Sequence, residues 1–428
     1  MKHLLMLVPF FPPMGGGGVY RPLSFVRHLP RYGWRTTVIT PAGDTYWIRD
    51  DSLVERVPAD CRVIRTQSWS GQAWLARRRG GRPSPKRSSR GFGAARRLAS
   101  AVLLPDSYVG WVPFAVRAAL EVAKTEHVDA VYSTSPPEST HLAGLKVHRE
   151  TALPWIADFR DPWMNLHLLD APSPLHKSMH RRMEKRVVTG ADAVVVTTRW
   201  NERAMHEAYP TSRVVRVSNG YDAEELAALD VPARDPRTFR IVHAGMLTQK
   251  RSATPFLEAL ARVLAADPGL RSEIAAEFIG PREDDNERSV ARLGLGDVVR
   301  FRDPLPHVEV LRTERAAQVL LLVKHADPRY DGLVPGKLYE YIGLRRPVLA
   351  LAPPGEARDL VASLRRGEVV SPSSGEEIER ALRTMLAHHR AGRLESAYDL
   401  SPRPEFDRAR LAGDLATALD AAVKGGAP

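Results

Sequence analysis

Short apolar runs alternate with amphipathic stretches of helical length along most of the chain. Continuous apolar runs are typical of strands that are buried on both faces of a parallel sheet, whereas half-exposed strands alternate apolar and polar residues. The runs that we predict to be strands in the first half are Leu4–Val8, Arg35–Thr40, Ala130–Tyr132, Trp155–Ala157 and Ala193–Thr197. The stretch Val19–Leu29 is a predicted helix. This alternation predicts an α/β domain.

The same pattern starts again near Phe239. The strands predicted there are Arg240–His243, Ala276–Ile279, Val298–Phe301, Val319–Val323 and Pro347–Leu351, and the helices are Thr254–Ala266, Arg282–Arg292, Lys337–Leu344 and Gly375–His389. Residues 230–238 contain two prolines and alternating charges, as a linker does. We therefore predict two doubly wound α/β domains, residues 1–230 and 239–400, and a helical tail, residues 401–428; the length of 428 residues suits two domains.

The positive charge of the chain is concentrated in one segment. Lys and Arg number 62 against 50 Asp and Glu, a net charge of +12, and residues 61–105 hold eleven of these basic residues and no acidic one. Within this range, residues 69–98 have poor periodicity, and we predict an arginine-rich insertion in the first domain. Aromatic residues follow the basic ones up to position 116. The region 77–116, which contains both kinds, has two interpretations. It either contacts an anionic membrane surface, or it is a solvated loop followed by an ordinary core helix.

Composition excludes several classes of protein and site. The single cysteine, Cys61, excludes a disulfide framework and a four-cysteine metal site, and no HExxH or GxSxG motif is present. We therefore expect no metal. No apolar stretch reaches the length of a membrane span, about 18 residues, and the apolar start of the chain is too short for a signal peptide. We expect a cytoplasmic protein.

Two motifs in the first half are candidates for binding and catalysis. Residues 15–18 are four glycines between the first predicted strand and helix, where backbone amides can approach an anion, although a plain tight turn is the alternative. The loop lacks both the dinucleotide fingerprint and the Walker A sequence. Asp158, Arg160 and Asp161 directly follow a predicted strand. Because ligands gather at the carboxyl ends of strands in open sheets, these residues are predicted to be catalytic; an ion pair that only fixes the loop is the alternative.

Two further motifs lie in the second half. Gly245, Lys250 and Arg251 stand between a strand and a helix, a suitable place for a diphosphate, although a charged surface turn has the same composition. In residues 335–341, Lys337 and Glu340 are three apart and share one helix face. A cation for a phosphate and a carboxylate for two hydroxyls would suit a nucleotide, whereas an exposed ion pair of this kind contributes only about 0.3 kcal/mol.

The order of these motifs resembles a known family. The glycine loop, residues 157–163 (Ala-Asp-Phe-Arg-Asp-Pro-Trp), residues 218–222 (Ser-Asn-Gly-Tyr-Asp) and residues 335–341 (Pro-Gly-Lys-Leu-Tyr-Glu-Tyr) occur as in the retaining, nucleotide-sugar-dependent glycosyltransferases of family four. The resemblance covers nearly the whole chain. It implies the GT-B fold, in which two Rossmann-like domains face each other across a cleft and a tail helix crosses back onto the first domain.

The resemblance also assigns roles to residues. It implies that Glu340 holds the ribose of the donor, that Lys250 or Arg251 neutralises its diphosphate, and that Asp158 or Asp161 faces the acceptor. The full donor-binding set that it implies is Gly16, Gly17, Gly245, Lys250, Arg251, Gly336, Lys337 and Glu340. It implies front-face attack with retention, no metal and no cofactor apart from the nucleotide sugar, which is a co-substrate. Two positions depart from the family pattern: Gly332 stands where a Glu is frequent, and Arg160 and Asp161 replace a frequent His.

From these features we expect transfer of a hexose-type sugar to a lipid-linked glycan precursor in cell-surface polysaccharide assembly, on the inner face of the membrane. A small-molecule acceptor such as a secondary metabolite remains open. An epimerase or a phosphorylase on the same fold is a further alternative. A nucleic-acid-binding protein that uses the arginine-rich segment ranks last, because the rest of the chain is nearly balanced in charge.

Overall fold

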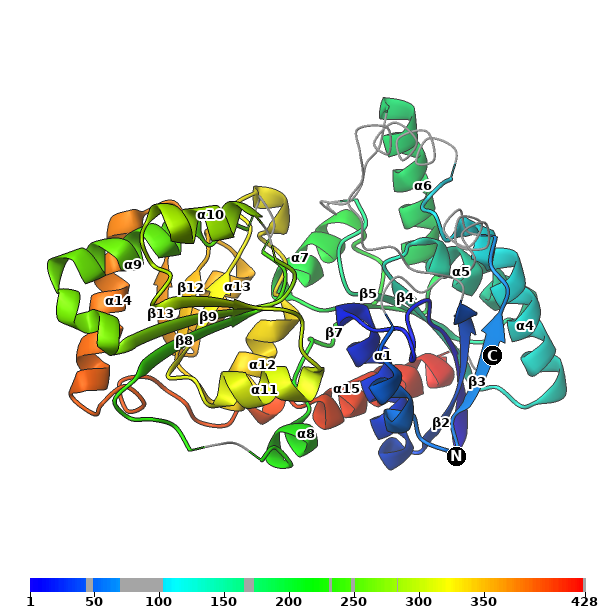
Figure 1. The fold of residues 1–428 in the computed structure, drawn as a ribbon. Coiled ribbons are helices and arrows are strands. Elements are labelled where there is room, and N and C mark those ends of the chain that lie inside the picture. The colour runs from blue at the N-terminus through cyan, green and yellow to red at the C-terminus, as the bar shows by residue number, and fades with distance from the viewer. Residues whose placement is uncertain are drawn as a thin grey trace. The chain divides into compact units, whose positions relative to one another are not determined.

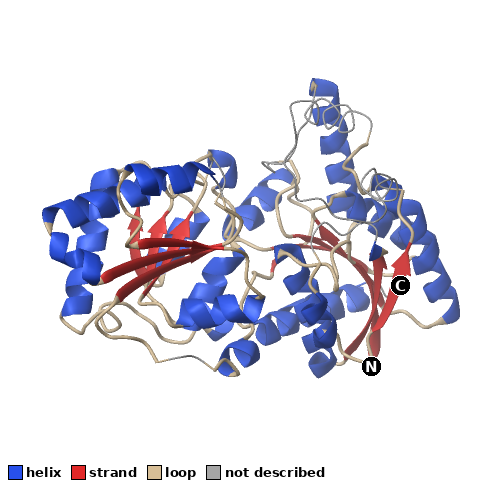
Figure 2. Ribbon diagram, in the orientation of Figure 1, coloured by secondary structure: helices blue, strands red, loops and turns tan. Residues whose placement is uncertain are grey.

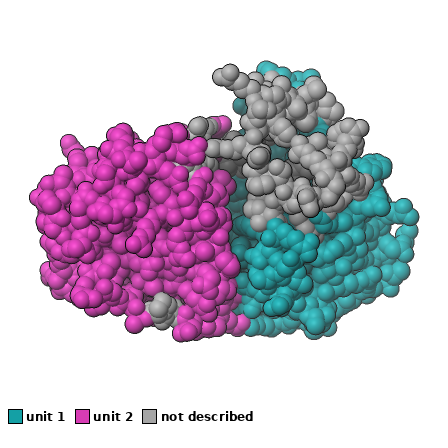
Figure 3. Space-filling model, in the orientation of Figure 1, with its two compact units in different colours: residues 1–219, 408–428 teal, residues 220–407 magenta. Residues whose placement is uncertain are grey.

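The computed structural model describes residues 1–43, 49–69, 103–164, 173–230, 233–247, 251–282 and 284–425. The chain divides into two compact units, residues 1–219 with 408–428 (unit 1) and residues 220–407 (unit 2), which are coloured separately in Figure 3. Apart from Trp69, the predicted arginine-rich insertion 69–98 lies outside the described residues, and so does Lys250.

Unit 1 contains a seven-stranded parallel sheet in the order β3-β2-β1-β4-β5-β6-β7 (Figures 1 and 2). Its strands are β1 (Lys2–Leu7), β2 (Trp34–Pro41), β3 (Arg62–Thr66), β4 (Ala130–Ser135), β5 (Trp155–Phe159), β6 (Ala193–Val196) and β7 (Val214–Arg216). Its helices are α1 (Gly17–His28), α4 (Val112–Thr125), α5 (Ser139–Thr151), α6 (Pro174–Gly190), α7 (Arg199–Ala208) and α15 (Arg408–Gly425). Although far apart in sequence, α1 and α15 pack against each other.

Strand β1 shows why an unbroken apolar run becomes a central strand. Successive side chains of a strand point to opposite faces of the sheet. Accordingly, Leu4 and Met6 belong to one hydrophobic cluster, with residues of α1 and α15, and Leu5 and Leu7 belong to another, with residues of α4 and α5. Both faces are covered by helices, so both sets of positions must be apolar.

Unit 2 is a second α/β unit with a six-stranded parallel sheet in the order β10-β9-β8-β11-β12-β13. Its strands are β8 (Phe239–Ala244), β9 (Ile274–Ile279), β10 (Val299–Arg302), β11 (Val319–Val323), β12 (Val348–Leu351) and β13 (Gly367–Val370). Its helices are α8 (Ala223–Ala227), α9 (Thr254–Ala266), α10 (Asp284–Arg292), α11 (His307–Arg315), α12 (Gly336–Leu344), α13 (Glu356–Ser363) and α14 (Gly375–Arg390). The predicted fold class, two doubly wound α/β domains, is confirmed.

The strand orders place one switch point in each unit. In unit 1, β1 lies between β2 and β4, and in unit 2, β8 lies between β9 and β11, so the connections leave in opposite directions from these central pairs. Loops diverge at such a point and leave a crevice outside the carboxyl ends of the strands, where ligands bind in open α/β sheets. The loops after β1, β4, β8 and β11 are therefore the ones to examine for function.

Candidate functional site

The glycine loop follows β1 at the switch point of unit 1. Gly16 precedes α1 with φ of 97°, a conformation that favours glycine, and no side chain caps the helix or places an acid in its first turn. A Cβ atom on Gly17 would meet nothing within 4 Å, whereas one on Gly18 would lie 3.0 Å from Nη1 of Arg160. The start of α1 therefore offers amide groups to an anion, and Gly18 makes room for Arg160.

Arg160 ties this loop to the neighbouring strand. Its Nε and Nη2 donate to the carbonyls of Ser135 (2.8 Å) and Pro136 (2.5 Å), at the end of β4, and its Nη1 donates to the carbonyl of Gly18 (2.7 Å). The side chain is only 9% exposed. These nitrogens bond to backbone carbonyls, so Arg160 shapes the crevice by fixing its loops. From its position in the sequence, Arg160 was predicted to be catalytic.

Asp158 has no exposed surface. It accepts two hydrogen bonds from the Arg21 guanidinium, at 3.0 and 2.9 Å, and one each from the hydroxyls of Tyr132 (2.5 Å) and Thr134 (2.9 Å). Burial would raise the pKa of Asp158, but Arg21 and these hydroxyls lower it below its ordinary value. Since its oxygens are sequestered, we reassign Asp158 from catalysis to holding α1 on the sheet; the alternative of an ion pair that fixes local structure describes it better.

Two more acidic side chains, Asp161 and Glu138, lie near the ends of β5 and β4, and Asp161 is the more exposed of the two. Asp161 is half-buried, and burial raises its pKa. Glu138 follows β4; burial and then the charge of Asp106 raise its pKa to about 8, and its Oε1 has no hydrogen-bond partner among the described residues. A carboxyl group that is protonated near neutral pH can act as a general acid or base. Glu138 was missed from the sequence, although its place directly after a buried strand was a usable signal.

In unit 2, Lys337 and Gly245 form the centre of the corresponding crevice. Nζ of Lys337, in α12, donates to the carbonyl of Ala244 at the end of β8. A Cβ atom on Gly245 would lie 2.0 Å from this Nζ, and the φ of Gly245 is +127°, so only glycine fits there. Burial lowers the pKa of Lys337 to about 8, while the nearby Glu314 opposes this shift.

Glu340 lies one turn after Lys337 with its side chain 18% exposed. Its Oε1 is 4.0 Å from Nε2 of His307, and the same His307 nitrogen is 3.7 Å from Glu225. Glu314, which the sequence did not single out, is 1% exposed, and burial and the charge of Glu340 raise its pKa well above the ordinary value. Glu340 is thus the carboxylate of this group that solvent or a ligand can reach.

Two more cations gather beside Lys337. Lys324, at the end of β11, donates from Nζ to the carbonyl of Tyr330 (2.5 Å), and burial lowers its pKa to about 8. The Arg251 guanidinium lies 5.9 Å from the centre of the Tyr330 ring, and its charge contributes to lowering the pKa values of both lysines. Gly336 is exposed at the start of α12, which has no side-chain cap and no acid in its first turn. Cations and helix amides together suit an anion such as a diphosphate.

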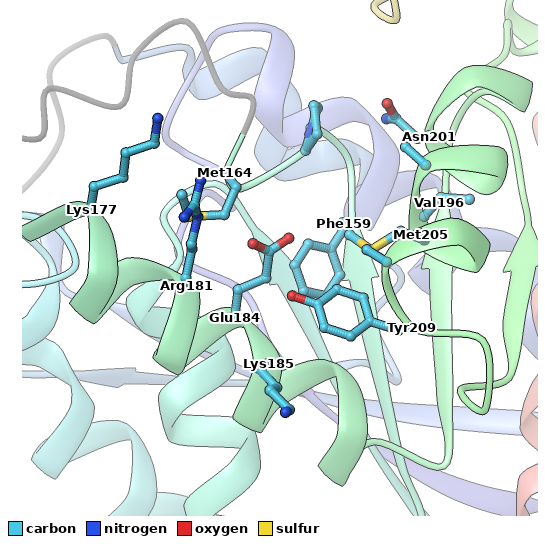
Figure 4. Close-up of a pocket in the computed structure, with 13 residues that line it drawn as sticks. Phe159, Met164, Lys177, Arg181, Glu184, Lys185, Val196, Asn201, Met205 and Tyr209 are labelled. Carbon is cyan, nitrogen blue, oxygen red and sulfur yellow. The ribbon is translucent and has the colours of Figure 1, made fainter. Parts of the chain in front are cut away.

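A pocket of about 410 Å³ lies beside the loop after β5, in unit 1 (Figure 4). It is lined by Phe159 at the end of β5, by Pro162 and Met164 of that loop, by Lys177, Arg181, Glu184 and Lys185 of α6, and by Val196, Asn201, Ala204, Met205, Ala208 and Tyr209. The loop is fixed beneath it by Trp163, whose Nε1 donates to Nδ1 of the buried His180 (3.0 Å). No motif in the sequence indicated this pocket.

The aromatic residues of the region 77–116 are not a surface patch in the part that the structure describes. Trp111, directly before α4, is fully buried in the core, Tyr108 is 7% exposed, and Phe114 is partly buried against the same core. Of the two interpretations of the region 77–116, the ordinary core helix therefore describes residues 103–116; residues 77–102 lie outside the described part. No helix among the described residues has the length and apolarity needed to traverse a bilayer.

No group of three His, Cys, Asp or Glu residues that could hold a metal ion occurs among the described residues. The expectation that the protein works without a metal remains a prediction.

Comparison with known proteins adds to this geometry. Residues 15–220 match the family model described as a glycosyl transferase 4-like domain. A D-inositol 3-phosphate glycosyltransferase of Thermobifida fusca is 26% identical over 232 residues, which are 48% of this chain and 51% of that protein, so the chain spans about half the length of this relative. The sucrose-phosphate synthase of Thermosynechococcus elongatus has 16% identity and a TM-score of 0.65 over 99% of this chain and 100% of its own. Anabaena HepE in complex with UDP and glucose has 15% identity and a TM-score of 0.64 over 98% and 100% of the two chains.

Proposed function

We propose that this chain transfers a sugar, with retention, from a nucleoside-diphosphate sugar to an acceptor hydroxyl, because residues 15–220 match the glycosyl transferase 4-like domain and the fold is GT-B. The acceptor that we propose is a lipid-linked glycan precursor in cell-surface polysaccharide assembly, used at the inner face of the membrane. Unit 2 binds the donor in this proposal, and unit 1 binds the acceptor.

One observation carries the proposal: three cations and one accessible carboxylate meet at the switch point of unit 2. Arg251, Lys324 and Lys337 supply positive charge beside the uncapped start of α12, and Glu340 stands one turn into that helix. Cations and helix amides suit a diphosphate, and a carboxylate can accept hydrogen bonds from the two hydroxyls of a ribose. The binding of UDP and glucose by HepE, which has the same fold, supports this choice of ligand.

The same groups account for leaving-group stabilisation. When the bond between sugar and phosphate breaks, negative charge develops on the departing diphosphate. Fixed cations and helix amides stabilise that charge without reorganising, so we propose that no metal ion is needed. Retention then follows if the acceptor hydroxyl attacks on the side of the departing phosphate, whose oxygen takes the hydroxyl proton. In unit 1, the half-buried Asp161 is the carboxyl group that we assign to orienting the acceptor.

The test is calorimetric titration of UDP and GDP, and of their sugar conjugates, into the wild type and two variants. Glu340→Ala is expected to weaken binding of the preferred nucleotide at least tenfold, because the ribose loses its acceptor of hydrogen bonds. Glu376→Ala, which removes an exposed carboxylate from the start of α14, is the matched control. Equal affinities of wild type and Glu340→Ala would contradict the assignment.

A second experiment separates transfer from the alternative activities on this fold. The protein is incubated with the preferred donor alone and then with donor and a lipid-phosphate-linked sugar. We expect a new glycosidic product only in the second mixture. Epimerised donor or sugar phosphate in the first mixture would identify an epimerase or a phosphorylase instead.

A further inference from the structure

The pocket between α6 and α7 is not accounted for by the donor site or by the crevice of unit 1. Its volume of about 410 Å³ falls within the range of small-molecule sites, roughly 300 to 1,000 Å³. Pro162, at its edge, is the residue after Asp161, the carboxylate assigned to the acceptor. A ligand in the pocket can therefore extend to the acceptor side of unit 1.

The floor of this pocket is apolar. Figure 4 labels Phe159, Tyr209, Met205 and Val196 among the residues that line it. Phe159 and Val196 have no exposed surface and Met205 is 5% exposed, so the apolar surface that the pocket offers to a ligand comes from the half-buried Met164, Ala204 and Tyr209. A floor of this kind favours a hydrocarbon segment over a hydrated sugar.

Asn201 adds a polar group that lacks a partner. It lies in the first turn of α7 and is 1% exposed, and neither oxygen nor nitrogen of its amide has a hydrogen-bond partner among the described residues. Its backbone amide, in contrast, donates to Oγ1 of Thr198 (3.2 Å). Since buried amides are nearly always satisfied, a ligand group that hydrogen-bonds to Asn201 would complete the site.

The rim of the pocket is cationic along one face of α6. Lys177, Arg181 and Lys185 are spaced by four residues, so they share a helix face, and all three are exposed. The acid among them, Glu184, is 6% exposed and turns its carboxyl group toward the two rings of the floor (Figure 4). Burial raises the pKa of Glu184 to about 7, which limits the negative charge that it presents inside the pocket.

From the apolar lining, the unpartnered amide and the row of cations, we propose that the pocket binds a phosphate ester of a long alkyl chain, with the chain on Met164 and Tyr209 and the phosphate at Arg181. This inference rests on the proposed function, because it makes the lipid-phosphate arm of the acceptor the occupant. The acceptor would then be recognised as an anionic amphiphile, through its alkyl chain and its phosphate.

The test is calorimetric titration of the full chain with decyl phosphate, below its micelle concentration. We expect saturable binding that the pocket-filling variant Ala204→Trp weakens at least tenfold. The triple variant Lys177→Gln, Arg181→Gln, Lys185→Gln, which alters exposed side chains only, is expected to weaken it to a similar extent. The double variant Arg182→Gln, Arg186→Gln is the control, because it removes two exposed cations of the same helix that do not line the pocket.

Two control ligands separate the contribution of the alkyl chain to binding from that of the phosphate. Decanol and sn-glycerol 3-phosphate are each expected to bind at least tenfold more weakly than decyl phosphate. Decanol binding as tightly as decyl phosphate would overturn the role of the cations, and glycerol phosphate binding more tightly would overturn that of the apolar floor. Equal affinity for decyl phosphate in the wild type and in the triple variant would also overturn the proposal. UDP binding should be unchanged in every variant, so loss of the lipid site and failure of the donor site give different results.

Discussion

At the scale of single residues, burial decides which ionisable groups can take part in chemistry. Asp158 lies in β5 and Glu138 follows the neighbouring β4, yet Arg21 keeps Asp158 ionised while burial and Asp106 raise the pKa of Glu138 to about 8. The sequence predicted Asp158 and Asp161 at this edge, because strand ends are readable, but not Glu138. It did not predict their different states, because the partner Arg21 is 137 positions away from Asp158.

Glu138 should make stability depend on pH. Its pKa is about 8 in the folded protein and near 4.5 when unfolded, so its stabilising contribution is fully present below pH 4.5 and is lost as the pH rises to 8. Glu138→Gln removes this dependence, so its stability relative to wild type should rise with pH, by up to about 5 kcal/mol at pH 8.5 and by little at pH 4.5. Thermal melts of both proteins at the two pH values measure the difference. A difference that does not grow with pH would count against a buried, protonated Glu138.

Gly245 should tolerate no side chain. Gly245→Ala places a methyl group where Nζ of Lys337 now lies and strains the backbone at φ of +127°, a cost of about 1–3 kcal/mol. We expect nucleotide affinity to fall at least tenfold in calorimetry because the Lys337 cation is displaced. Gly296→Ala is the control, since its new methyl group would meet nothing within 4 Å. Wild-type nucleotide affinity in Gly245→Ala would disprove this role of the glycine.

At the scale of elements, the sequence predicted central strands well and edge strands poorly. The bounds of β11 and α9 were predicted correctly, and β1 was predicted one to two residues late, because these elements are apolar throughout or strongly amphipathic. Strands β3, β7 and β13 were missed. They lie at the edges of their sheets and are mostly half-exposed, so their apolar runs are short and interrupted.

Helix α1 depends on one buried ion pair for its position. Besides its two bonds to Asp158, the Arg21 guanidinium donates to the carbonyls of Val217 (2.9 Å) and Ser218 (2.7 Å). Arg21→Met would leave Asp158 buried without its partner, and we expect a loss of about 3–5 kcal/mol in the free energy of unfolding. Arg117→Met, at an exposed position of α4, is the control. Chemical denaturation monitored by circular dichroism checks the difference, and similar stabilities of the two variants would refute the structural role of the pair.

At the scale of the whole molecule, the account assigns the donor to unit 2 and the acceptor to unit 1. Sequence order predicted two similar α/β units and the motifs at the ends of β1, β5 and β8. It could not predict the pocket between α6 and α7, because its apolar floor uses residues that a sequence pattern assigns to the core. Nor could it predict the third cation, Lys324, which is an ordinary residue after a strand until the fold brings it to Arg251 and Lys337.

Independence of metal ions follows from this assignment. If Arg251, Lys324 and Lys337 stabilise the departing diphosphate, sugar transfer should proceed at an unchanged rate after dialysis against EDTA. Initial rates with and without added Mg²⁺ or Mn²⁺ check this expectation. Activity lost in EDTA and restored by either ion would show that the cations of unit 2 are insufficient.

The most direct measurement for the central claim is a crystal structure of the protein with UDP, or with whichever nucleoside diphosphate binds most tightly. The account predicts the diphosphate at the carboxyl ends of β8 and β11, beside Lys337 and the start of α12, with both ribose hydroxyls within hydrogen-bond distance of the Glu340 carboxylate. A diphosphate bound elsewhere in the chain, or a Glu340 carboxylate that makes no contact with the ribose, would contradict it.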